Sequence, residues 1–174
     1  MFAQTTPQSK TLSLADLALI KAVETFDLDA LGKALAAGGR PTVRKPYRGL
    51  TGEPLTLMAV RRGQAPLLEA LLSAGAPIDE GLAMAAALLV ERATRAGDEE
   101  QLKHAQAIVE RLEANQIDWG VCDRSIGAGL RAIDLLAAAQ PNWALSASRR
   151  QGLDPIGHTL PGFPNPHQTH RTRR

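Results

Sequence analysis

The sequence predicts an all-α protein, and three observations support that fold class. The 174 residues are 44% hydrophobic but only 3% aromatic, and the apolar set is mostly Ala and Leu, which favours packed helices over a sheet. Apolar residues recur at helical spacing. Glycine or asparagine ends several of these segments at near-regular intervals. We therefore expect one sizeable helical domain over residues 12–153.

Four expected helix stops set the period of the chain. They are Gly38, Gly75, Asn115 and Gly152, which lie 37, 40 and 37 residues apart. Gly and Asn tolerate the left-handed backbone conformation that commonly follows the end of a helix. Four such stops at similar distances predict a repeat array.

A pair of helices is expected before each of the first two stops. In the first pair, residues 13–24 and 28–37, the break "TFD" supplies Asp27 as a cap for the second helix. In the second pair, residues 54–62 and 65–74, the break is "RRGQ", and the leucines of "APLLEALLSAGAPID" recur at helical spacing before the stop.

The last two pairs follow the same plan. Residues 81–96 and 99–114 are separated by "RAGDEE", in which Asp98 is placed to cap the second helix. Residues 128–139 and 142–151 are separated by "AQPN", and "SIGAGLRA" is interpreted as the entry to the first of these helices rather than as a phosphate-binding loop.

The second pair resembles an ankyrin repeat. "PLTLMAVRRGQAPLLEALLSAGAPID" follows that family's order of Pro-Leu, a small residue in the first helix, Gly at the turn, a leucine-rich second helix and a closing Gly-Ala. The matching residues are Pro54, Leu55, Ala59, Gly63, Leu67, Leu71, Leu72, Gly75 and Ala76. "LIKAVETFDLDALGKALAAGG" matches more loosely. The resemblance implies an ankyrin-like solenoid of about four helix-turn-helix repeats.

The chain also departs from the ankyrin pattern. The family's Thr-Pro-Leu-His turn is reduced to "EPLT", and the spacing exceeds the family's usual 33 residues. The alternatives are an irregular helical bundle and another solenoid of helical hairpins. A solenoid would bind its partners through its concave face and its projecting loops.

The two ends of the chain differ in composition from the body. Residues 154–174 contain four prolines in "PIGHTLPGFPNPHQTHRTRR" and have no helical period, so we expect a disordered tail. Residues 1–11 are expected to be a flexible N-terminus. From residue 149 onward, five arginines and Asp154 carry a net charge of +4, which leaves the rest of the chain with a charge of about −2. This charge argues against a nucleic-acid partner for the body.

A basic segment is the strongest candidate for a binding site. It lies in the long connection "GGRPTVRKPYRGLTGE" at residues 38–53 and continues into the next helix. Arg and Tyr are enriched among residues that dominate interface energy. The predicted contact residues are Arg40, Arg44, Lys45, Tyr47, Arg48, Arg61 and Arg62. The alternative is a solvated loop whose charges maintain solubility.

An acidic segment and the scattered nucleophiles give no motif for catalysis or metal binding. Residues 91–118 hold seven acids and four bases, and Asp98, Glu99 and Glu100 suit a helix N-terminus. His104, Cys122 and Asp123 lie in no recognisable catalytic motif. We expect no enzyme activity, no cofactor and no metal, and an unrecognised active site near those last three residues is the alternative.

The functional expectation is a non-catalytic module that binds another protein with an acidic surface through its concave face and the basic loop at residues 39–52. A bacterial adaptor or toxin-neutralising immunity protein is one setting, and a secreted effector that engages a host protein is the other. The single cysteine, the absence of a secretory signal and the absence of a long apolar run predict a cytoplasmic protein with no membrane partner. The sequence specifies no oligomeric state.

Overall fold

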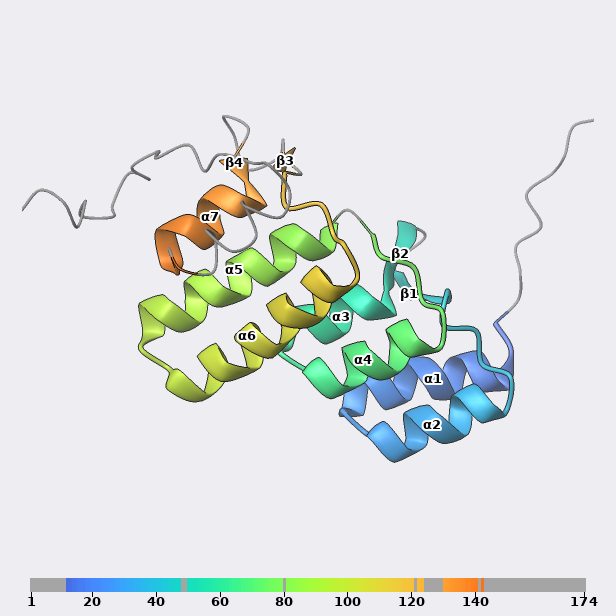
Figure 1. The fold of residues 1–174 in the computed structure, drawn as a ribbon. Helices are drawn as coiled ribbons and strands as arrows, with labels where there is room; N and C mark the ends of the chain where they lie inside the picture. The colour runs from blue at the N-terminus through green and yellow to red at the C-terminus, as the bar shows by residue number, and fades with distance from the viewer. Residues whose placement is uncertain are drawn as a thin grey trace, which may run out of the picture. The chain divides into compact units, whose positions relative to one another are not determined.

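The computed structural model describes residues 12–47, 50–79, 81–120, 122–123, 130–140 and 142. Most of these residues are helical, as the sequence predicts. They form the seven helices α1 to α7 (Figure 1). The chain forms two compact units. The described residues of the first lie within Met1–Ala59 and Pro66–Pro77, and those of the second lie within Val60–Ala65 and Ile78–Arg174.

The first unit is built on a helical hairpin. Helix α1 (Leu14–Thr25) packs against α2 (Leu28–Ala36), and Leu19, Val23 and Leu31 are fully buried. The antiparallel strands β1 (Arg44–Tyr47) and β2 (Leu50–Pro54) follow. The unit also holds most of the residues of α3 (Leu55–Arg61) and α4 (Ala65–Ser73).

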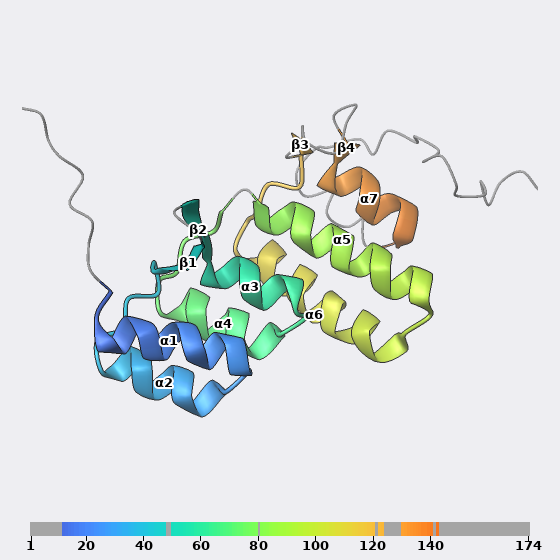
Figure 2. The ribbon, with the colours of Figure 1, turned by 180° about the vertical axis from the view of Figure 1, so that it is seen from behind.

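The second unit is centred on α5 (Gly81–Ala96), which packs against both α6 (Glu99–Ala114) and α7 (Ala132–Ala139) (Figures 1 and 2). Because α5 is covered on two sides, it buries residues around most of its circumference, many of them alanines. Two short paired strands, β3 (Cys122–Asp123) and β4 (Leu130–Arg131), precede α7. The fully buried Trp119 accepts a backbone hydrogen bond from Ile133.

Three helices end with the same hydrogen-bond pattern. In α2, the N–H of Gly38 donates to Leu35 and that of Gly39 donates to Ala34. Helices α4 and α6 repeat these two bonds at the same offsets from their last residues. This pattern is a Schellman motif, and it requires one residue in the left-handed conformation. Gly38 and Gly75 have that conformation, with φ of 90° and 88°.

The expected stop at Asn115 is one residue early. Asn115 has a φ of −95°, and Gln116 is the left-handed residue, with a φ of 58°. Asn115 instead donates a side-chain hydrogen bond to the carbonyl of Arg111. Gly152 lies outside the described residues.

Aspartate caps begin two of the second helices, as predicted. The carboxylate of Asp27 accepts from the N–H of Ala30, and that of Asp98 accepts from the N–H of Gln101. In each hairpin the residue before the cap, Phe26 or Gly97, has a positive φ. The short breaks "TFD" and "RAGDEE" therefore end one helix and start the next.

Two regions differ from the expected helical plan. The connection at residues 38–53 contains the β1–β2 pair rather than an irregular loop. The helix expected at residues 128–139 begins at Ala132, because Leu130–Arg131 pairs as β4. The helix expected at residues 142–151 lies outside the described residues except for Asn142. The predicted flexible ends, residues 1–11 and 154–174, also lie outside the described residues.

We predict that Leu71→Ala lowers the free energy of unfolding by about 2–5 kcal/mol, because truncating a buried leucine leaves a cavity. Leu71 is 0% exposed. Leu17→Ala is the control, since Leu17 is 49% exposed, and it should cost less than about 0.5 kcal/mol. Urea denaturation measures both values, and equal costs would contradict the assignment of the buried face.

We predict opposite effects for two glycine substitutions. Gly75→Ala should destabilise the protein by about 1 kcal/mol, because an alanine is strained at a φ of 88°. Gly32→Ala should stabilise it by about 0.5–1 kcal/mol, since Gly32 lies within α2 and an added Cβ meets no atom within 4 Å. Thermal denaturation compares the two variants, and the same sign for both would contradict the helix-end geometry.

Candidate functional site

A buried ion pair fixes the start of the basic segment. Asp16 is 0% exposed, and its carboxylate accepts from the backbone N–H of Arg40 at 2.9 Å and from Nη2 of Arg40 at 2.6 Å. It also accepts from the backbone N–H of Ser13, whose hydroxyl accepts from the N–H of Asp16. Asp16 therefore caps α1 and binds the chain that follows α2.

Gly39 allows this close approach. A Cβ at Gly39 would lie 2.8 Å from the carbonyl oxygen of Ala34 and 3.0 Å from that of Ala15. Both atoms belong to backbone, so neither can move away at low cost. A residue with a side chain at this position would displace Arg40 from Asp16.

The ion pair shifts the ionisation of its carboxyl group. The hydrogen bond from the Arg40 side chain, with further bonds from the backbone N–H groups of Arg40 and Ser13, holds the pKa of Asp16 well below its ordinary value of 3.8, although burial opposes this shift. The same contact raises the pKa of Arg40. Asp16 thus remains ionised at neutral pH despite being buried.

The paired strands carry the next predicted contacts. Arg44 is exposed and donates from Nη1 to the carbonyl of Gly52 at 3.1 Å, and Lys45 forms an ion pair with Glu24 of α1. A Cβ at Gly52 would lie 2.3 Å from the Lys45 carbonyl oxygen, so glycine is needed where the two strands approach. The backbone of Tyr47 is part of β1, and Arg48 lies outside the described residues.

The two remaining predicted contacts line a cavity in the second unit. Arg61 ends α3 and Arg62 follows it, and both border an open cavity of about 360 Å³. Its other lining residues come from the turn after Arg62, from α5 and from the start of α6. They are Gly63, Gln64, Leu89, Arg92, Asp98, Glu100, Gln101 and His104.

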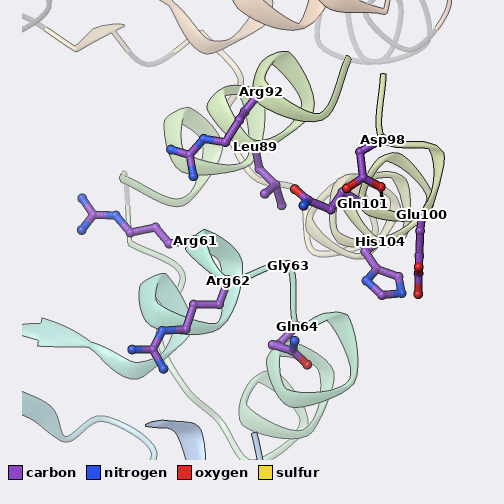
Figure 3. Close-up of a pocket in the computed structure, with 10 residues that line it drawn as sticks. All are labelled: Arg61, Arg62, Gly63, Gln64, Leu89, Arg92, Asp98, Glu100, Gln101 and His104. Atoms are coloured by element: carbon purple, nitrogen blue, oxygen red, sulfur yellow. Dashed lines mark hydrogen bonds between the residues drawn. The ribbon is translucent and has the colours of Figure 1, made fainter. Parts of the chain in front are cut away.

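The cavity has charge of both signs. Figure 3 shows the side chains of Arg61, Arg62 and Arg92 on one side and those of Asp98 and Glu100 on the other. Leu89 lies between them and is largely buried. Gly63, with a φ of 70°, turns the chain so that an added Cβ would lie 4.0 Å from both Leu89 and His104. Sequence reasoning missed Arg92 and the opposing acids as parts of one site.

The three acidic residues at the start of α6 have the structural role that the sequence predicts. Asp98 is the N-cap of α6, and Glu99 and Glu100 occupy its first turn, where negative charge is favourable. Among the described residues, no group of three or more His, Cys, Asp or Glu side chains is placed to hold a metal ion. None of the described helices has the length and apolar character required to cross a membrane.

The residues of the alternative active site lie on different elements. His104 is exposed in the second turn of α6, whereas Cys122 and Asp123 form β3, beyond the C-terminal end of that helix (Figure 1). The ten steps along the helix from His104 to Ala114 span about 15 Å at 1.5 Å per residue. The side chains of Cys122 and Asp123 are outside the described part of the structure.

Comparison with other proteins gave no related protein. No protein-family model matches the chain, and searches of curated proteins and of solved structures gave no match. The resemblance to ankyrin repeats therefore depends on the sequence pattern alone.

We predict that Asp16→Asn destabilises the protein at about pH 7 and that this difference shrinks in acid. Because the folded-state pKa of Asp16 is depressed, its stabilising contribution is fully present above 3.8 and is lost as pH falls below that value. Urea denaturation of both proteins at about pH 7 and about pH 3 measures the effect. A difference that stays constant over this range would contradict an ionised, bonded Asp16.

Proposed function

We propose that this chain is a non-catalytic interaction module that binds a partner protein with an acidic surface, chiefly through residues 39–52. The observation that carries the proposal is that Arg40, Lys45 and Arg44 are held by Asp16, Glu24 and the Gly52 carbonyl respectively. A segment that is held before binding loses less conformational entropy in the complex. More of the energy of its contacts is then available as affinity.

The basic residues of this segment differ in what they can offer a partner. Arg40 is 40% exposed, and its bonds to a buried carboxylate make it a positioning residue. Lys45 and Glu24 form a partly exposed pair, which is weak in water and can be exchanged for a partner's carboxylate. Arg44 is exposed and donates from Nη1 to the Gly52 carbonyl, so its guanidinium is oriented at the surface.

The finer fold that we propose is an ankyrin-like solenoid of about four repeats over residues 12–153, flanked by flexible segments at 1–11 and 154–174. Its support is the shared Schellman ending of α2, α4 and α6, in which the left-handed residues are Gly38, Gly75 and Gln116. A repeated helix end at a period near 40 residues is typical of helical repeat proteins.

The proposal includes no catalysis, cofactor or metal. Its setting is a cytoplasmic adaptor or immunity protein, and a secreted effector is the alternative. The absence of catalysis is supported by the position of His104 on a different element from Cys122 in β3. A general base must lie within hydrogen-bond reach of its nucleophile. A toxin gene beside the gene for this chain would support the immunity role, whereas a secretion chaperone gene there would support the effector role.

We predict that replacing Arg44, Tyr47 and Arg48 together by Ala weakens partner binding by at least about 2 kcal/mol, which is the scale of an interface hot spot. The partner is first captured by affinity purification with the full chain, and its affinity for both proteins is then measured by calorimetry. The double variant Lys21→Ala with Lys33→Ala is the control, because it removes two exposed basic residues from α1 and α2.

Removal of residues 156–174 should cost less than about 1 kcal/mol of binding at physiological salt, because separated exposed charges are largely screened there. Loss of binding on removal of these residues, with normal binding by the triple variant, would contradict the proposed site. The helical body would then act only as a carrier for the C-terminal segment.

A further inference from the structure

The cavity of the second unit, called here the bipolar cleft, has the properties of a binding site for a charged segment. Its volume of about 360 Å³ lies within the range of small ligand sites. Three arginines occupy one side, so their mutual repulsion favours an anionic group between them. In the described part of the chain, the Arg92 side chain forms no ion pair or hydrogen bond with another residue.

The opposite side of the cleft restricts which anion fits. The carboxylates of Asp98 and Glu100 would repel a ligand that is negative along its whole length, such as a polyphosphate or a nucleic acid. The same carboxylates attract a cationic group. The largely buried Leu89 lies between the two charged sides and offers an apolar contact to aliphatic carbons.

We propose that the bipolar cleft binds a short segment of a partner protein that carries an acidic side chain and a basic side chain on neighbouring positions. The acidic side chain binds Arg61, Arg62 and Arg92, and the basic one binds Asp98 and Glu100. This inference rests on the proposed function, since it adds the kind of sequence that the partner presents. It differs from that function in using a site in the second unit.

The charges of the cleft give specificity as well as affinity. A wholly acidic segment meets Asp98 and Glu100, and a wholly basic one meets the three arginines, so each suffers like-charge repulsion on one side. Only a segment with both charges in the matching order satisfies both sides. The cleft therefore selects the orientation of the bound segment along with its composition.

The test uses synthetic peptides rather than an unidentified partner. Three capped peptides of equal length carry neighbouring glutamates and lysines, glutamates only, or lysines only, and each is titrated into the isotopically labelled full chain by NMR. Inorganic phosphate is a fourth titrant. We expect the mixed peptide to bind most tightly and to shift the backbone amide signals of Gly63, Gln101 and His104.

Two matched pairs of variants locate the binding. Arg92→Ala and Glu100→Ala should each raise the Kd of the mixed peptide at least about fivefold, as expected for the loss of a contact to a charged group. Arg95→Ala and Glu99→Ala remove the same charges from the same helices, but neither residue lines the cleft. Their effect should be less than about twofold. Thermal denaturation confirms that all four variants are folded.

Three outcomes would overturn the inference. Equal effects of the matched variants would indicate general charge attraction, and tighter binding of phosphate or of the all-glutamate peptide would indicate a simple anion site. The absence of any shift at Gly63, Gln101 and His104 would show that the cleft does not bind such peptides. None of these results depends on the Arg44, Tyr47 and Arg48 variant, so the cleft can fail while the proposed function stands.

Discussion

Removing a carboxylate from water costs several kcal/mol unless hydrogen bonds and an opposite charge replace the solvent. In the first unit, Asp16 is fully buried and receives donors from Ser13 and Arg40. These bonds connect the first turn of α1 to a residue 24 positions later, directly after α2. The carboxylate therefore sets the direction in which the chain leaves the helical hairpin and enters β1, and the placement of the basic strand depends on it.

The second unit uses a related device. Asp134 is a largely buried residue in the first turn of α7. Its carboxylate accepts hydrogen bonds from Nε of Arg131 at 2.9 Å and from Nη2 of Arg131 at 2.8 Å. Here the charged partner is only three residues away, so the pair stabilises the start of one helix. The spacing Ser-x-x-Asp at residue 13 is a capping-box signal that the sequence contains. Arg131 is not a usual N-cap residue, so no comparable signal precedes α7.

Helix positions were predictable because their determinants are local. Asp27, Asp98 and Gly75 act through bonds within a few residues of themselves, and these bonds occur where the sequence pattern indicates. The β1–β2 pair was missed because its register depends on the approach of Gly52 to Lys45, which no periodicity reports. From the sequence, only Arg61 and Arg62 of the cleft were named as contacts, because the cleft also depends on contacts between distant parts of the chain. Its arginines come from the end of α3, from the turn that follows and from α5, and only the folded second unit shows that they line one cavity.

The two basic sites differ in how charge and rigidity are combined. In the first unit, Arg40 and Lys45 already have carboxylate partners, so the strand gains order but loses part of its attraction for an acidic surface. In the cleft, Arg92 forms no ion pair or hydrogen bond with another described residue, and it faces the acids across an open cavity. Arg92 therefore keeps its attraction for an acidic group, but its exposed side chain must be ordered when a ligand binds. The strand therefore suits contacts that depend on shape, whereas the cleft suits recognition that depends on the order of charges in the partner.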